Sequence, residues 1–83
     1  MDFVKGQLVR SKAGRDQNRT LAVLEVQNEW LLLADGKRRT LARPKRKKAK
    51  HVAATTTVLE ETQLQTDKRL HAAILDYDTA HPI

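Results

Sequence analysis

The stretch Thr20–Gly36 reads TLAVLEVQNEWLLLADG and contains two apolar, β-capable segments, residues 20–26 and 30–34. The polar residues 27–29 between them indicate a turn. Both segments are apolar at consecutive positions, so simple alternation cannot assign an inner and an outer face. Either both faces are covered, as a barrel with a packed C-terminal element would achieve, or one face contacts a partner.

Asp35 and Gly36 form the strongest two-residue hairpin signal in the chain, because a type I′ turn requires positive φ at both central positions. They predict a second hairpin after residues 30–34. The returning strand is then expected at residues 39–42, a short basic segment that Pro44 interrupts or ends.

The N-terminal residues extend this β pattern. Phe3-Val4 and Leu8-Val9 flank Gly6, and a polar, turn-rich loop follows at residues 13–18. The β-branched segment 52–58 is either a closing strand or an extended connector. Strands at about ten-residue spacing in so short a chain predict a small antiparallel barrel, because closure removes exposed sheet edges.

The C-terminal third carries a helix signal at about residues 66–77. Thr66-Asp67 is an N-cap pattern, and it precedes an i, i+3, i+4, i+7 apolar stripe at Leu70, Ala73, Ile74 and Tyr77. A helix this short is marginal alone, so we expect it to pack on the barrel or on a partner. The prediction is a mainly β chain, with the barrel in residues 1–58. Residues 59–83 would form an acidic connector and the short helix, packed on the barrel or partly mobile.

The charge of the chain is unevenly distributed. Its 83 residues include 16 Lys and Arg against 10 Asp and Glu, a formal net charge of +6. Residues 1–50 hold 14 of the cations and 5 of the acids, whereas residues 51–83 hold 2 cations and 5 acids. This balance favours a polyanionic partner that docks on the first part of the chain.

Neither a catalytic site nor a metal site is expected. The chain has no cysteine, and its three histidines lack metal-ligand spacing. Ser11 is the only serine, and no acidic pair has a base or nucleophile beside it. The glycines form no phosphate-cradling pattern, so we expect no cofactor and no small-molecule substrate. No stretch resembles a signal peptide or a membrane span, which predicts a cytoplasmic protein without membrane contact.

The stretch Arg43–Lys50 reads RPKRKKAK, six cations in eight residues. Taken alone, it fits a solvated surface, a nuclear address or a surface that lies against phosphate. Joined to a basic loop, a run this dense exceeds what solubility requires, so we expect nucleic-acid contact. Pro44 suits the edge or the start of a strand, and the run is therefore expected to be partly folded, as strand edge and loop rim.

Three ordered segments resemble a KOW motif, which consists of a strand, a glycine-bearing basic loop and a returning strand. They are Val4–Val9, Ala13–Asp16 and Arg19–Val26. With Ala34–Lys37 and the run 43–50, the layout over roughly residues 2–52 resembles the short bacterial KOW-domain RNA-binding proteins. Those proteins are similar in turn to KOW-containing large-subunit ribosomal proteins of archaea and eukaryotes. The resemblance implies an SH3-like barrel that contacts RNA through basic loops.

One position departs from that motif. The loop after Gly14 usually carries a second glycine, and the corresponding residue here is Asn18. Asparagine tolerates left-handed φ better than other non-glycine residues, so Gly14 and Asn18 are both expected to form the motif turn.

The resemblance implies a non-catalytic, ribosome-associated or translation-related role. The ligand would be structured RNA, first of all ribosomal RNA, and a ribosomal or other protein is a further candidate partner. Cations on the loops would neutralise phosphates and fix the register of the RNA. The candidate RNA-binding residues are Lys12, Arg15, Arg19, Lys37, Arg38, Arg39, Arg43, Lys45, Arg46, Lys47 and Lys48.

The aromatic content sets a limit on the mode of binding. Three aromatic residues are too few for a sheet that stacks bases, so recognition of RNA shape and phosphate is expected. Trp30 opens an apolar strand and is expected in the core. Two other functions stay open: an SH3-like protein-interaction module, since fold alone does not decide function, and a non-specific DNA-binding protein.

Overall fold

The two apolar segments, residues 20–26 and 30–34, form a hairpin. Strands β2 (Thr20–Gln27) and β3 (Trp30–Ala34) pair antiparallel. Asn28 turns the chain between them with φ of 58°, a conformation that asparagine accepts more readily than most residues. The register shifts between Val23 and Glu25, and such an irregularity bends β2 as a small barrel requires.

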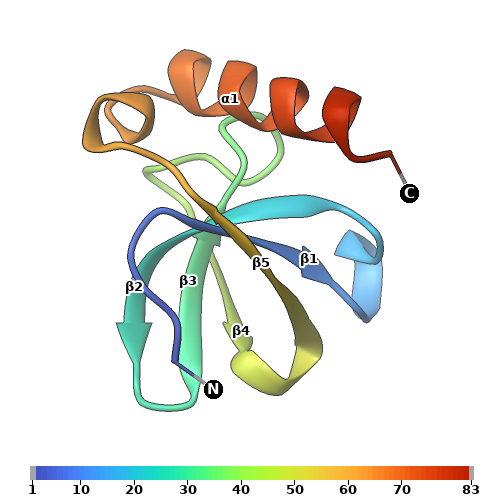
Figure 1. Cartoon of the computed structure of the whole chain (residues 1–83). Coiled ribbons are helices and arrows are strands. Elements are labelled where there is room, and N and C mark those ends of the chain that lie inside the picture. The colour runs from blue at the N-terminus through green and yellow to red at the C-terminus, as the bar shows by residue number, and fades with distance from the viewer. Residues whose placement is uncertain (1, 83) are drawn as a thin grey trace.

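The computed structural model describes residues 2–82, in which five antiparallel strands form one curved sheet (Figure 1). The strand order is β4-β3-β2-β1-β5. The remaining strands are β1 (Gln7–Ser11), β4 (Lys45–Lys48) and β5 (Val52–Val58). Two short 3₁₀ helices lie between strands, η1 (Gly14–Asp16) and η2 (Ala49–His51), and a third, η3 (Glu61–Leu64), follows β5. The chain is therefore mainly β, an SH3-like barrel-type fold with one C-terminal helix, as predicted.

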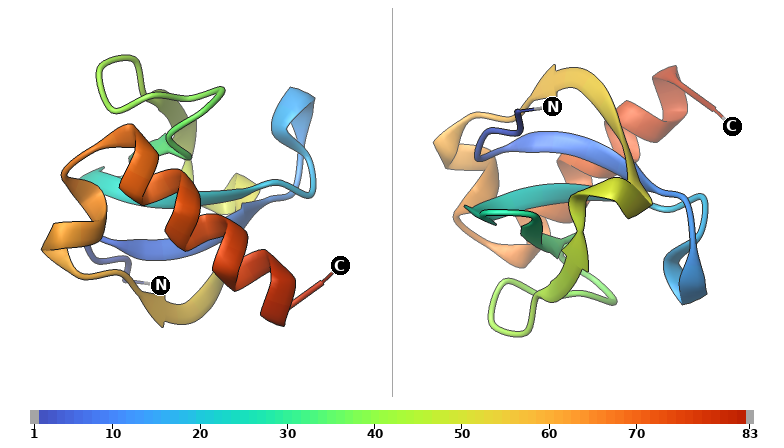
Figure 2. Two further views of the ribbon diagram at one scale, coloured as in Figure 1. Left: turned by 90° about the horizontal axis from the view of Figure 1, so that it is seen from above. Right: turned by 90° about the horizontal axis from the view of Figure 1, so that it is seen from below.

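The helix α1 (Asp67–Ala80) lies across one end of the barrel (Figures 1 and 2). Thr66 is its N-cap, and the Thr66 hydroxyl accepts the backbone N–H of Arg69 at 3.1 Å. The helix begins where the sequence predicts and extends three residues beyond the predicted end. Within residues 2–82, no helix has the length and apolar character needed to cross a membrane.

Both faces of the central strands are covered, which explains their failure to alternate. One cluster of buried side chains fills the barrel and consists of Val9, Leu21, Val23, Leu31, Leu33 and Val52. A second cluster lies between the sheet and α1 and consists of Leu8, Ala22, Ala34, Leu70 and Ile74. The predicted apolar stripe of α1 thus packs on the barrel.

The segment after β3 differs from the prediction. Residues 39–42 form no strand, and β4 instead begins directly after Pro44. The reason is the side chain of Asp35, whose carboxylate accepts the backbone N–H groups of Lys37 and Arg39, both at 2.9 Å. These bonds close a local loop in place of a two-residue hairpin turn.

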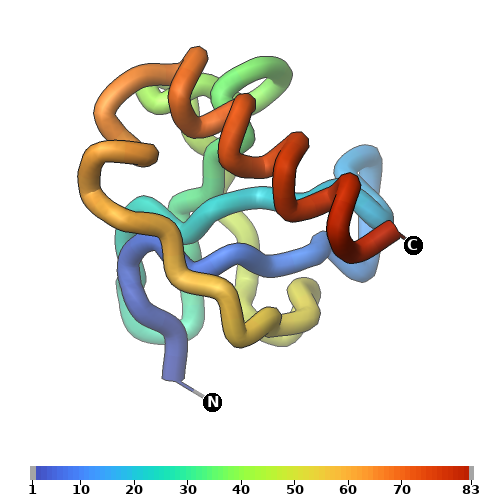
Figure 3. The backbone as a smooth tube through the Cα atoms, turned by 45° about the horizontal axis from the view of Figure 1, so that its top comes forward, coloured from blue at the N-terminus to red at the C-terminus, as the bar shows by residue number. Residues whose placement is uncertain are grey.

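The loop between β3 and β4 packs against the first turn of α1 (Figure 3). The backbone N–H of Leu41 donates to the carboxylate of Asp67 at 2.8 Å. Gly36 has φ of 81°, and a Cβ there would collide with the Asp67 carbonyl oxygen and lie 2.9 Å from the backbone nitrogen of His71. The loop and the start of the helix therefore hold each other in place.

Gly36→Ala is expected to lower the free energy of unfolding by roughly 2 kcal/mol or more. A left-handed alanine costs about 1–2 kcal/mol, and the added methyl must also displace α1. Gly14→Ala is the matched control, because its φ is 78° but its Cβ would meet only the Lys47 ammonium, at 3.5 Å. Urea unfolding of the three proteins measures the difference, and equal losses in the two variants would contradict this packing.

Candidate nucleic-acid interface

Strand β4 places alternate cations on opposite faces of the sheet. Lys47 lies opposite Leu31 of β3, and Leu31 is fully buried in the barrel. Directly paired residues point to the same face, so Lys47, and with it Lys45, lies on the inward side. Arg46 and Lys48 then lie on the outer side. The basic run is therefore an edge strand, as predicted, with an inner and an outer half.

The inner half of β4 lies beside a buried carboxylate of η1. Asp16 is only 2% exposed and accepts two hydrogen bonds from the Arg39 guanidinium, from Nη2 at 3.0 Å and from Nε at 3.3 Å. The Lys47 ammonium is nearly buried and donates to the carbonyl oxygen of Ala13 at 2.9 Å. Arg39 and Lys47, both candidates for RNA contact, thus make contacts inside the protein.

The charge state of Asp16 follows from these neighbours. Burial alone raises the pKa of this carboxyl group. The hydrogen bond and positive charge of Arg39, with the charges of Lys47 and Lys45, outweigh burial and lower the pKa below its ordinary value. Asp16 therefore stays ionised at neutral pH and ties η1, the β3–β4 loop and β4 together.

Trp30 is only partly buried and lies outside both hydrophobic clusters, so its expected place in the core is wrong. The guanidinium carbon of Arg46 lies 4.1 Å, and the Lys48 ammonium 5.3 Å, from the centroid of the Trp30 ring. Trp30 precedes the buried Leu31, so pleating directs it to the outer face, where these cations lie. Such contacts are worth about 0.5–1 kcal/mol each at exposed sites.

A hollow of about 340 Å³ opens beside Trp30. Apart from that ring, its lining comes from β4 and η2 and consists of Lys45, Arg46, Lys47, Lys48, Lys50 and His51. Lys50 was not among the predicted site residues, although its place in the basic run was a signal for it.

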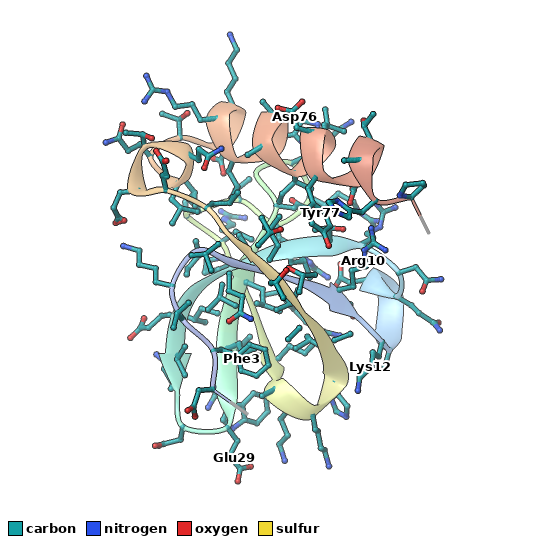
Figure 4. The ribbon with its side chains drawn as sticks, viewed as in Figure 1. Phe3, Arg10, Lys12, Glu29, Asp76 and Tyr77 are labelled. Carbon is teal, nitrogen blue, oxygen red and sulfur yellow. The ribbon has the colours of Figure 1, made fainter. Side chains whose placement is uncertain are left out.

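Two further hollows follow around η2. One is lined by Glu29, Lys48 and Lys50, and the next by Phe3, Lys12 and Lys50, in each case with Ala49. Phe3, Lys12 and Glu29 lie in the half of the molecule away from α1 (Figure 4). We define the basal surface as the aromatic ring and the cations that follow these three hollows, namely Trp30, Arg46, Lys48, Lys50 and Lys12.

The other predicted cations lie elsewhere. A hollow of about 410 Å³, here termed the α1 groove, is lined by charged side chains of both signs, namely Arg19, Lys37, Arg38, Asp35 and Asp78, and by residues of α1. Arg15 on η1 and Arg43 in the β3–β4 loop are exposed and line neither the groove nor the basal hollows. The predicted cations therefore form separate groups and not one patch.

The histidines do not assemble a metal site. His51 lies on η2, whereas His71 is on α1 and His81 follows it. The His81 ring stacks on Tyr77 with 4.3 Å between ring centroids, which is a packing role. Among the residues that the structure describes, no group of three or more side chains could hold a metal ion.

The loop that resembles a KOW motif has the expected turn. Gly14 and Asn18 both have positive φ, 78° and 68°. The backbone N–H of Asn18 donates to the carbonyl oxygen of Ser11 at 2.9 Å, which closes the loop at its base. The sequence matches no protein-family model and no curated protein. Membership of the KOW family therefore stays a prediction from the segments themselves.

Asp16→Asn is expected to lower the free energy of unfolding at pH 7 by about 2 kcal/mol, because the neutral amide loses the negative charge and keeps one acceptor oxygen for the two donors of Arg39. The pKa of Asp16 is lower in the folded than in the unfolded protein. Its contribution is therefore complete above the unfolded-state pKa of about 3.9 and is lost as the pH falls through the folded pKa. Urea unfolding at pH 7 and at about pH 2 should show the difference between wild type and variant shrink.

Asp76→Asn is the control for this measurement. Asp76 is exposed on α1 (Figure 4), so its replacement should change the stability little at either pH. A loss for Asp16→Asn that is the same at both pH values would contradict the role given to the ionised carboxylate.

Proposed function

We propose that the protein is a non-catalytic RNA-binding protein that holds the phosphates of structured RNA on its basal surface. The observation that carries this proposal is the outer half of β4, where Arg46 and Lys48 are fixed on a hydrogen-bonded strand beside Trp30. Side chains already held in place lose less conformational entropy when they meet a ligand, so this array is suited to binding.

The crowding of like charges supports a polyanionic ligand. Arg46, Lys48 and Lys50 lie within five residues, and in the described part of the chain none of them forms an ion pair. Their mutual repulsion is relieved when a polyanion binds. The planar guanidinium of Arg46 can hold a phosphate with two hydrogen bonds, whereas the lysines act as point charges.

Ribosomal RNA is the ligand that we propose, in a ribosome-associated or translation-related role. The support is the KOW-like order of the segments in residues 2–52, together with a barrel of the type that this resemblance implies. A ribosomal or other protein is a further proposed partner. The proposed compartment is the cytoplasm, in keeping with a chain that has no cysteine.

The α1 groove favours a second candidate function, protein interaction. Ile74 lines the groove, and Leu75 beside it is 51% exposed, so an apolar strip lies between charges of both signs. Such a surface suits a peptide with mixed side chains. This alternative predicts that a partner binds at the groove and ignores the basal surface.

Arg46→Ala/Lys48→Ala is expected to weaken binding to a folded ribosomal RNA fragment by at least about tenfold at moderate salt. The slope of log affinity against log salt should become shallower by about two units, because two phosphate contacts are lost. Lys37→Ala/Arg38→Ala removes the same charge from the α1 groove and should change both quantities less. Titrations over a range of salt concentrations, with duplex DNA of equal length in parallel, measure these effects.

The outcomes separate the candidate functions. Equal losses in the two double variants would indicate non-specific attraction and contradict binding at the basal surface. DNA affinity equal to RNA affinity would favour the DNA-binding alternative. If neither nucleic acid binds, the proposal is wrong and the α1 groove becomes the better candidate site.

A further inference from the structure

Trp30 is the only tryptophan of the chain, and its partly exposed ring lies beside the cations Arg46 and Lys48. We propose that its ring is the stacking platform for one unpaired base, so that the preferred ligand is an RNA stem with a bulged or looped-out nucleotide. This inference rests on the proposed RNA binding and specifies which RNA the basal surface selects.

The backbone that carries the Trp30 ring is fixed from both sides. Its backbone is paired with Gln27 of β2 and with Lys48 of β4, so the two neighbouring strands hold its Cα in place. The adjoining hollow of about 340 Å³ falls within the range of small-ligand sites, about 300–1,000 Å³. A flat base can therefore enter beside the ring without a change in the backbone.

The guanidinium of Arg46 can give up its place over the Trp30 ring to a base. Its guanidinium lies over the ring in the free protein, at 4.1 Å from the centroid. An exposed cation–π contact is weaker than the stacking of a base on an aromatic ring, so replacing the guanidinium by a base favours the complex. The released Arg46 stays beside the base, where it can bind a flanking phosphate or stack on the second face of the base.

The lysines of the basal surface provide a path for the flanking backbone. From Trp30 the hollows continue past Lys48 and Lys50 to Lys12, and Lys50 lines all three. Residues of η2 line each of the three hollows, and this turn of the chain lies at the end of the barrel away from α1 (Figure 1). Glu29 is the acid at these hollows, and its repulsion of phosphate keeps the backbone on the lysine side.

The geometry selects an unpaired base over a paired one. Inside a stem, both faces of each base are covered by neighbouring bases, so a tryptophan ring reaches a base face only where the base has left the stack. A bulged base is already unpaired and costs least to extrude. The cations therefore bind any stem, and Trp30 adds a preference for the stem with a free base.

Three RNA stems of equal length test this inference: a fully paired stem, a stem with a single-adenine bulge, and the same bulge with an abasic nucleotide. The abasic stem keeps the bulged backbone and lacks the base. The adenine bulge should bind about five- to tenfold tighter than the other two stems. It alone should quench the fluorescence of Trp30, the only tryptophan present.

Two variants test whether the Trp30 ring causes the preference for the adenine-bulge stem. In Trp30→Leu all three stems should bind with the affinity of the paired stem, whereas Trp30→Phe, which keeps an aromatic face, should retain part of the preference. Lys37→Ala/Arg38→Ala should leave the preference unchanged. Trp30 belongs to neither buried cluster, so these variants are expected to fold, and urea unfolding checks that they do.

The results distinguish failure of the stacking from failure of RNA binding. If the wild type binds all three stems equally and without quenching, RNA binding stands and the stacking platform is wrong. A preference that persists in Trp30→Leu overturns it as well. If no stem binds, the proposed function itself is wrong, and the stacking platform fails with it.

Discussion

The buried carboxylate of Asp16 is the interaction on which the basic half of the structure depends. Side chains alternate along a strand, so a strand made of four consecutive cations must turn two of them toward the barrel. The Lys47 ammonium donates to the carbonyl oxygen of Ala13 and is attracted by the negative charge of Asp16. Asp16 also accepts a hydrogen bond from Arg39. Without the Asp16 carboxylate, burial would leave an uncompensated positive charge. The free-energy penalty of that charge would exceed the stabilisation from pairing β4 with β3.

Anchoring the inner half of β4 determines what the outer half can do. Once Lys47 is fixed, Arg46 and Lys48 are held on the opposite face, paired to β3 and directed at Trp30. A flexible tail with the same residues would have to order its backbone on binding, at about 1–2 kcal/mol per residue. The run is therefore a preorganised surface because half of its charge is used for structure.

Local patterns predicted the elements whose geometry is decided by near neighbours in the sequence. These are the two strands of residues 20–34 with the turn between them, the helix whose N-cap is Thr66 and the left-handed turn at Asn18. The segment after β3 was mispredicted because the Asp35 carboxylate closes a local loop with the backbone of Lys37 and Arg39. The path of this loop also depends on a contact with Asp67 of the distant helix. Trp30 was misplaced for a related reason: consecutive apolar residues hide which face is buried, and only tertiary packing assigns it.

The distribution of acids gives the two ends of the barrel different roles. At the α1 end, the groove cations share their hollow with Asp35 and Asp78, and the negative end of the α1 dipole adds to these charges. At the other end, Glu29 is the acid that lines the basal hollows, against six lysines and arginines. This field would draw the proposed RNA ligand to the basal surface before any contact forms. For the proposed RNA ligand, the helix that covers the apolar face of the sheet thereby also favours approach from the basal side.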